Sequence, residues 1–506
     1  MHLWDDIQLI ENNYNLKAVR KFSDIFHFVL KPSKPVSNFF LAWGQWWGHG
    51  MVGQHRILSL LLHAAVVFLL YANLHAFRRR LTSDIPRQFP FWVALLFALA
   101  PIHTEAIGVT WFRMDILGAL FTLSGMLSVQ KIGTSRHRLF WFSCLFLSLG
   151  LATFSKETFA FTMPVAVLIT GWVTGSLKWR GALAIGVAQT FWVGLLLCLL
   201  TLDAQSEFPY DDVIGLNILE VPLHLRLAAS ALFEGIYKTL SGHGLTIVRL
   251  QERVGLGIHW GVQGAAAFIS LWIGVLGWLY YCGGFLRVWG VILGASSGIY
   301  LAIPNMNIGS ERYWYFPAAS LFTLLIYGIW CAVARFSRRP VRILSVIVLF
   351  YAVALGMGLE SRVSRMFSRE RFYRGEWKRH PEAVATWSDM ATVLTEQAKY
   401  DEAEKFIKHA KEMDATHPNV LMAEFLLDYH RKNLKAARVT FARIQSEFKH
   451  KPQLMGLFHF HIGILEEKQE SPAAAARSYL KAMEADPKVN FYQEVYEKNI
   501  KLAKGK

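Results

Sequence analysis

The sequence predicts an all-α protein, with a polytopic membrane helix bundle followed by a C-terminal α-solenoid. Hydrophobic residues make up 53% of its 506 residues, and the mean hydropathy is +0.29, which is too apolar for a soluble globular chain. Long apolar stretches continue to residue 359, whereas the remainder is rich in Lys, Glu and Ala. We therefore expect a membrane domain at 1–359, a linker at 360–380 and a helical repeat domain at 381–506.

The membrane domain is expected to contain nine or ten spans. A spanning helix needs about 17 to 25 mostly apolar residues to cross the hydrocarbon core. Two of the apolar stretches are short and are expected to tilt, break or end below the interface. The segment 226–240 is a candidate interfacial helix rather than a span. The expected spans are 57–77, 89–103, 114–131, 139–155, 159–175, 182–202, 259–281, 285–304, 315–334 and 341–359.

The distribution of charge predicts the orientation. Basic residues gather at the cytoplasmic ends of membrane helices, so the net charge of +16 does not indicate nucleic-acid binding. One set of alternate loops is strongly basic, and the other carries most of the acids and is predicted to face outward, together with the chain after residue 359. The basic set is Arg78, Arg79, Arg80, Arg87, Lys131, Arg136, Arg138, Lys178, Arg180, Arg287, Arg335, Arg338, Arg339 and Arg342.

This orientation has a consequence for the N-terminus. Residues 1–56 would lie outside, although the run that follows Met1 has neither the basic start nor the apolar core of a signal peptide. We expect a further transmembrane helix of about 20 residues upstream of Trp4. The alternative is that the first span carries the N-terminus across.

The C-terminal region shows a repeat. Prolines recur at Pro381, Pro418, Pro452 and Pro487, at intervals close to the ~34-residue period of tetratricopeptide repeats. The runs AKYDEAEKFIKHAKEMDATHPN and SPAAAARSYLKAMEADP resemble the second helix of such a repeat, with small residues where paired helices approach. About three repeats are expected to stack, and a plain helical bundle is the alternative. Such surfaces often bind proteins, by fold analogy.

Four polar clusters fall in loops that are predicted to face outward. Ionisable groups at membrane depth are costly, so their convergence on one face favours a common site. Singly, an acidic pair is equally typical of a solvated loop or a helix cap, and a Lys-Glu pair is typical of an interfacial anchor. The clusters are Asp5 and Asp6; His103, Glu105, Arg113 and Asp115; Lys156 and Glu157; and Glu311, Arg312, Tyr313 and Tyr315.

Five regions carry a family resemblance. They are WDDIQLIENN (4–13), KPVSNFFLAW with HRILSLLLHAAVVFLLY (34–71), FALAPIHTEAIGVTWFRMDILGALFTLSGML (97–127), FSKETFAFTMPVAVLI (154–169) and GSERYWYFPAASLFTLLI (309–326). In this order they resemble the membrane part of the transmembrane O-mannosyltransferases with TPR repeats, the TMTC family. The sequence departs from the usual pattern at the missing first span, at Ala100, where His is common, and at Lys34, where Arg is common.

The resemblance implies a fold and an activity. The fold is that of the GT-C glycosyltransferases, and the activity transfers a sugar, typically mannose, from a polyprenyl-phosphate carrier to a protein hydroxyl outside the cytosol. We expect a bacterial relative in the inner membrane. An acceptor hydroxyl needs a carboxylate to take its proton, and family placement gives this role to Asp5 and Asp6, with Asp5 as first choice.

The leaving phosphate departs as an anion and needs cations rather than a protonating acid. Arg113, Lys156 and Arg312 are the candidates, since Arg in particular holds two phosphate oxygens at once. The alternative is that they form structural ion pairs with Asp115, Glu157 and Glu311. His103 and Glu105 are candidates for binding sugar hydroxyls or the acceptor, and orientation of the cations is an alternative role for Glu105. The same donor-binding set includes Asp115, Glu157, Glu311 and Tyr313.

No Walker A loop or GxGxxG motif after a strand is present, so we expect no cofactor and a lipid-linked donor as substrate. Asp5 and Asp6 are adjacent rather than spaced as in a DxD motif, and Asp211 and Asp212 lie in an acidic loop, so we also expect no obligatory metal. The expected partners are this donor, membrane lipid and an acceptor protein held by the repeat domain. Two other classes remain. One is a polyprenyl-linked glycan ligase or polymerase of the O-antigen type, and the other is a non-catalytic scaffold that works through its repeats.

Overall fold

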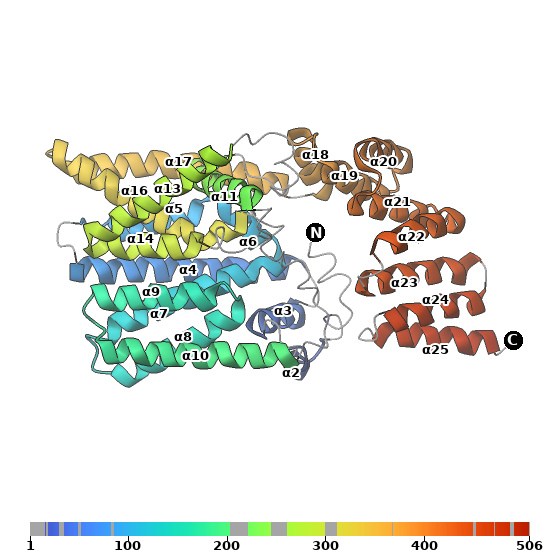
Figure 1. The fold of residues 1–506 in the computed structure, drawn as a ribbon, viewed down its shortest axis with the longest axis horizontal. Coiled ribbons are helices and arrows are strands. Elements are labelled where there is room, and N and C mark those ends of the chain that lie inside the picture. The colour runs from blue at the N-terminus through green and yellow to red at the C-terminus, as the bar shows by residue number, and fades with distance from the viewer. Residues whose placement is uncertain are drawn as a thin grey trace. The chain divides into compact units, whose positions relative to one another are not determined.

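A computed structural model gives the fold (Figure 1). It describes residues 16, 19–29, 35–48, 52–81, 85–202, 221–243, 261–298, 311–366, 368–448, 452–469, 471–485 and 490–504. Every regular element within these ranges is a helix, which confirms the predicted all-α class. The contacts divide the chain into two compact units, Met1–Ser364 and Arg365–Lys506.

The first unit is a helix bundle in which short turns join several neighbouring long helices, such as α7 to α8 and α16 to α17 (Figure 1). Its elements are α2 (Phe22–Val29), α3 (Pro35–Gly48), α4 (Val52–Leu81), α5 (Phe89–Leu99), η2 (Pro101–His103), α6 (Thr104–Gly108), η3 (Thr110–Phe112), α7 (Arg113–Ile132), α8 (Arg138–Ser155), α9 (Phe159–Val173), α10 (Trp179–Leu202), α11 (Val221–Ser241), α13 (Val262–Cys282), α14 (Gly284–Ser297), η6 (Glu311–Trp314), α16 (Tyr315–Phe336) and α17 (Pro340–Arg365).

The described part of the chain contains six or seven candidate spans, against nine or ten expected for the whole sequence. Among the described residues, six helices are long and apolar enough, and a seventh is added if α5 and the turns after it form one span with a 50° bend. Helices α9 and α14 have 15 and 14 residues, which is short of a full crossing. Helix α7 has the length, but 14 of its 20 residues are buried, so it is enclosed by other helices.

The outer surface of the bundle is apolar. Large hydrophobic side chains project from several of the spanning helices, including Phe68 (67% exposed), Leu271 (65%) and Phe350 (72%). Large apolar surfaces on a protein mark contact with a partner or a membrane. This surface is suited to lipid, and together with the six apolar helices it supports an integral membrane protein.

Glycines allow α7 to pack closely against α9. A Cβ on Gly118 would lie 2.1 Å from Cδ2 of Phe159, and one on Gly125 would lie 2.3 Å from Cε of Met163. The two glycines are seven residues apart and therefore lie on one helix face. Small residues at helix contacts are typical of membrane bundles, and here they hold the N-terminal end of α7 against the start of α9.

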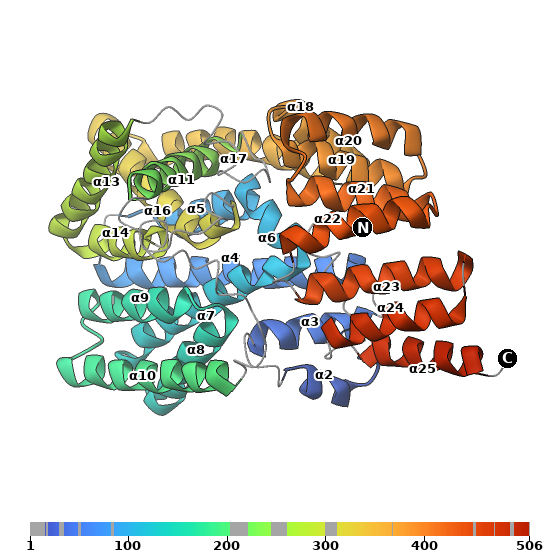
Figure 2. The same ribbon diagram turned by 45° about the vertical axis from the view of Figure 1, so that its right-hand side comes forward.

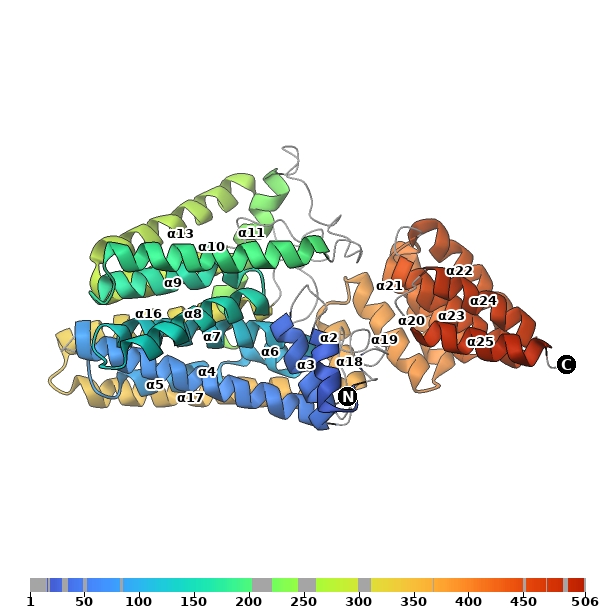
Figure 3. The same ribbon diagram turned by 90° about the horizontal axis from the view of Figure 1, so that it is seen from below.

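The two ends of the bundle differ in charge. At the end where α4, α7 and α16 finish, the last turns carry Arg78–Arg80, Lys131 and Arg335. Arg80 donates hydrogen bonds to Ser176, to the Gln130 carbonyl and to Thr134 there. Helices α2, α3 and α6 lie at the opposite end (Figures 1 and 3).

The second unit consists of consecutive helices that pack in pairs (Figure 2). Ala403 and Ala410 are fully buried, as expected for positions where paired helices approach. Residues 360–380, the expected linker, are mostly helical, since they include the last turn of α17 and all of α18. The helices are α18 (Arg369–Arg379), α19 (Val384–Glu396), α20 (Tyr400–Asp414), α21 (Pro418–His430), α22 (Leu434–Phe448), α23 (Pro452–Gln469), α24 (Pro472–Ala485) and α25 (Asn490–Lys504).

Candidate active site

A break in the chain after α5 creates the polar end of the bundle. Ala100 is extended and Pro101 follows it, as expected because the residue before a proline is disfavoured in helical conformation and proline lacks an N–H for the helix ladder. Three short turns, η2, α6 and η3, then lead into α7. These turns and the first residues of α7 carry His103, Glu105, Arg113 and Asp115, all of them buried.

Lys156 and Asp115 form a buried ion pair. Lys156 ends α8 in an extended conformation, and its Nζ lies 2.5 Å from Oδ1 of Asp115, with side chains 8% and 5% exposed. The same Nζ lies 4.3 Å from the ring centroid of Tyr313. Oδ2 of Asp115 is buried and has no hydrogen-bond partner among the described residues. The pair therefore retains an acceptor oxygen that a ligand hydroxyl would satisfy.

Arg312 lies next to this pair but is held differently. Its guanidinium carbon lies 3.6 Å from the Phe112 ring centroid and 5.2 Å from that of Tyr313. Its backbone N–H donates to Oε2 of Glu105 at 2.9 Å. Nε of Arg312 is buried without a hydrogen-bond partner in the described part of the chain. The side chain is thus oriented by aromatic faces, as guanidinium groups often are.

Arg113, the third candidate cation, has its donors directed at the protein. Nε donates to Ser59 Oγ at 3.1 Å, Nη1 to the Phe40 carbonyl at 2.9 Å and Nη2 to the His55 carbonyl at 2.8 Å. These contacts join α3 and α4 to the start of α7. The geometry is that of a structural brace, built from a serine hydroxyl and backbone carbonyls rather than from the ion pair that the sequence left open as the alternative.

His103 lies in an aromatic cluster behind the ion pair. Its ring is 1% exposed and lies 4.3 Å from Phe97, 4.6 Å from Tyr315 and 5.3 Å from His63, between centroids. His63 Nδ1 is 2.7 Å from the Tyr315 hydroxyl. This arrangement packs His103 against rings rather than against Glu105, its neighbour in the sequence motif.

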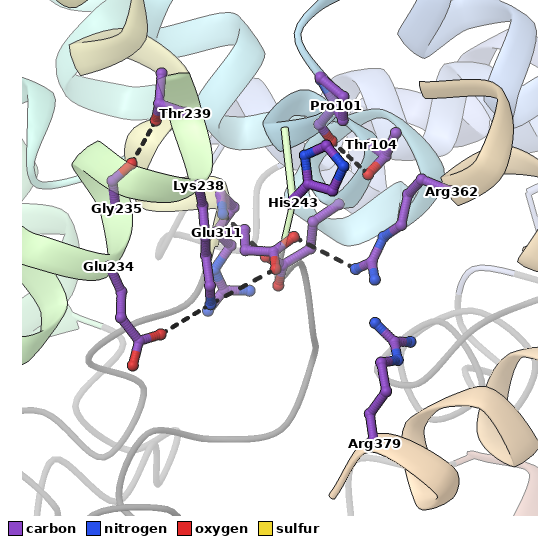
Figure 4. Close-up of polar contacts among 12 residues, drawn as sticks. Pro101, Thr104, Glu234, Gly235, Lys238, Thr239, His243, Glu311, Arg362 and Arg379 are labelled. Carbon is purple, nitrogen blue, oxygen red and sulfur yellow. Dashed lines mark hydrogen bonds and ion pairs between the residues drawn. The ribbon is translucent and has the colours of Figure 1, made fainter. Parts of the chain in front are cut away.

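A network around Glu311 contains residues that sequence reasoning did not select (Figure 4). Arg362 Nη2 lies 3.3 Å from Oε2 of Glu311, and Lys238 Nζ lies 3.9 Å from Oε1. Lys238 also pairs with Glu234 at 3.0 Å. Two features of the sequence could have pointed to these residues. One is the i,i+4 spacing of Glu234 and Lys238, and the other is Arg362, a charged residue near the end of the long apolar helix α17.

The structure therefore joins three of the four predicted clusters at one end of the bundle. Contacts connect α7 with the α8–α9 junction and η6 with α6 and η3. Glu157 is exposed at the start of α9. Asp5 and Asp6 lie outside the described residues. The described residues contain no group of three or more His, Cys, Asp or Glu placed to hold a metal.

Comparison with known proteins finds a similar sequence over part of the chain. The chain is similar to a protein O-mannosyl-transferase. This relative, human TMTC4, is 28% identical over 149 residues, which cover 26% of this chain and 20% of the relative. The matched region thus spans about a fifth of that protein's length. No protein-family model and no solved structure matches the chain. The matched part of this chain thus resembles a membrane protein of the TMTC type.

Proposed function

We propose that this protein is a membrane glycosyltransferase that moves a sugar, mannose by its resemblance, from a polyprenyl-phosphate carrier to a hydroxyl of an acceptor protein on the outer face of the membrane. The observation that carries the proposal is the buried set of Lys156, Asp115, Tyr313 and Arg312, which comes from three separate parts of the bundle. Buried ionisable groups in a membrane helix bundle mark functional sites by default.

The chemistry of the set suits a lipid phosphate. In the proposed reaction the acceptor oxygen bonds to the anomeric carbon, the bond from that carbon to the phosphate oxygen breaks, and the carrier leaves as an anion. Arg312 and Lys156 are placed to stabilise this developing charge, and cations of this kind act most strongly where water is excluded. The proton of the acceptor hydroxyl passes to the carboxylate of Asp5 or Asp6.

The sugar of the donor has a candidate hydrogen-bond partner in Asp115. A sugar hydroxyl is a suitable donor for Oδ2 of Asp115, whose other oxygen is held by Lys156. A buried acceptor without a partner costs about 1–3 kcal/mol, so a ligand that satisfies it gains affinity. Arg113 is left out of the donor site because its guanidinium is directed at α3 and α4.

The C-terminal unit completes the proposal. We assign its paired helices to a tetratricopeptide-like solenoid that holds the acceptor protein outside the cytosol. The pairing of helices and the buried Ala403 and Ala410 support this assignment, because each helix pair of a repeat buries its apolar face against the next.

The test is a transfer assay with purified protein, a polyprenyl-phosphate mannose donor and a protein acceptor. Arg312→Met and Lys156→Met should lower kcat/KM by about 100-fold to 1,000-fold, as loss of a charge-stabilising donor does. Asp5→Asn should lower kcat with little change in donor KM. Arg335→Met is the matched control, since Arg335 is exposed at the far end of the same span.

Three outcomes count against the proposal. One is absence of transfer from any polyprenyl-phosphate sugar by the wild-type protein, which is the result expected of a scaffold. The second is transfer to a glycan or lipid but not to a protein, which is the result expected of an O-antigen-type ligase. The third is full activity of both cation variants, which would place the donor elsewhere.

A further inference from the structure

Helix α11 packs closely on the turn that carries Arg312. A Cβ on Gly235 would lie 1.7 Å from both Cε2 and Nε1 of Trp314, the last residue of η6. Trp314 is 1% exposed, so its ring has little room to move. Glycine at position 235 is therefore what allows α11 to lie against η6 at this distance.

The same helix face reaches the first residue of η6. Lys238 follows Gly235 by about one helical turn, and its Nζ lies between Glu234 and Glu311 (Figure 4). One surface of α11 thus contacts η6 at both ends, by packing at Trp314 and by charge at Glu311. This segment corresponds to 226–240, which the sequence identified as a candidate interfacial helix.

Arg362, near the end of α17, holds Glu311 from a second direction. Its Nη2 lies 3.3 Å from Oε2, and both side chains are 1% exposed. A buried carboxylate needs an opposite charge close by. Removal of one partner of a buried ion pair is strongly destabilising, because it leaves the other charge buried and uncompensated. Lys238 and Arg362 together meet that requirement from two helices distant in sequence.

The turn η6 depends on such external contacts. It is a 3-10 helix of four residues, Glu311–Trp314, and segments of this length have few hydrogen bonds of their own. Its two inner residues are Arg312 and Tyr313, which face Phe112 and Lys156. Displacement of either end of η6 would therefore change the direction of both side chains.

We propose that Gly235, Lys238 and Arg362 are positioning residues that hold η6 so that Arg312 and Tyr313 point at the sugar-phosphate donor. This inference rests on the proposed function, because it assigns the donor to those two side chains. The three residues act through η6 and do not touch the substrate. We therefore expect substitutions at these residues to lower activity through Arg312, so that the loss depends on whether Arg312 is present, in addition to any effect on stability.

The first experiment adds one methyl group. Gly235→Ala should lower kcat/KM for the polyprenyl-phosphate sugar about 10-fold to 100-fold, as small misplacement of a catalytic group does. Gly328→Ala, on α16, is the matched control, since nothing lies within 4 Å of the Cβ it adds. Trp314→Leu, combined with Gly235→Ala, removes the ring atoms that clash and should restore part of the activity.

The second experiment tests coupling. In an Arg312→Met background, Gly235→Ala should cost less than threefold, because its effect passes through the residue already removed. Arg362→Lys should retain most of the activity and Arg362→Met should not. Equal losses from Gly235→Ala with and without Arg312, or a lowered thermal midpoint with unchanged kinetics, would show that these residues are structural only.

A readout independent of transfer separates this inference from the proposed function. Hydrogen–deuterium exchange of peptides that cover 311–314 should speed up in Gly235→Ala and Arg362→Met but not in Gly328→Ala. If the wild type transfers no sugar but exchange responds in this way, the proposed function is wrong, and Gly235 and Arg362 hold η6 without directing it at a donor. If the wild type transfers sugar and exchange does not respond, the positioning role is wrong.

Discussion

At the scale of single residues, two arginines that look alike in the sequence have different environments. Arg113 and Arg312 both follow an aromatic or acidic residue at the polar end of an apolar helix. Arg113 directs its guanidinium at a serine hydroxyl and two backbone carbonyls. Arg312 lies over an aromatic ring with Nε unbonded among the described residues. The first geometry braces helices, and the second leaves donors for a ligand.

This contrast gives a prediction for Arg113. Arg113→Ala would leave the Phe40 and His55 carbonyls and the Ser59 hydroxyl without this partner, and each unsatisfied buried group costs about 1–3 kcal/mol. The variant should have a clearly lower thermal midpoint in detergent, while the folded fraction keeps the donor KM of the wild type. Arg338→Ala, in an exposed turn at the other end of the bundle, is the control. A raised donor KM at unchanged stability would return Arg113 to the donor site.

At the scale of elements, the breaks between helices matter as much as the helices. The proline after α5 ends that helix and begins the turns that carry Glu105. The glycines of α7 determine how close the start of α9, and with it Lys156, comes to Asp115. The apolar character of a segment specifies that it becomes a helix of the bundle. The proline after α5 and the glycines of α7 specify where the polar turns begin and how close they come to one another.

Helix α7 provides a prediction about packing. Gly118→Ala places a methyl group 2.1 Å from a ring carbon of Phe159, and overpacking of this kind costs about 1–3 kcal/mol. Thermal stability in detergent should fall, and Phe159→Leu in the same chain should recover part of the loss. Gly194→Ala, on α10, adds a methyl group into open space and should have no effect. Equal stability of the Gly118 and Gly194 variants would contradict the close packing.

Helix α23 provides a prediction about pH. Burial, with a smaller contribution from Lys481, lowers the pKa of His459 to about 4, below its unfolded value of ~6.5. The folded state therefore favours neutral His459, so its contribution to stability is present above pH ~6.5 and is lost as the pH falls toward 4. In the full-length protein, hydrogen-exchange protection of α23, corrected for intrinsic rates, should decrease over this window. His459→Gln should reduce that decrease; a pH response identical to that of the wild type would exclude His459 as its source.

At the scale of the whole molecule, the separation of charge predicts orientation. The arginines at the end of α4 and the polar cluster near α6 lie at opposite ends of the bundle. Because basic residues are retained on the cytoplasmic side, a reporter inserted after Arg80 or Arg339 should be cytoplasmic. A reporter fused after Lys506 should be external. Protease protection in sealed vesicles would check both, and a cytoplasmic C-terminus would overturn the outward-facing site.

The sequence by itself determined the all-α class of this protein and selected the residues of its candidate site. Apolar stretches must be helical in lipid, since backbone groups find no other partners there. A charged residue next to such a stretch costs free energy at membrane depth and therefore indicates a functional site. Asp115, Lys156 and Arg312 were selected for this reason.

Only the tertiary structure decided how these residues are used. Hydropathy counted ten spans, whereas six helices, or seven with the bent pair, pass by length and composition in the described residues. Local sequence cannot show whether a short apolar helix crosses the bilayer or packs within the bundle. Nor can it show that Arg113 faces carbonyls, or that Lys238 and Arg362 meet at Glu311. These contacts join helices far apart in the chain, and they exist because packing brings particular helix ends together.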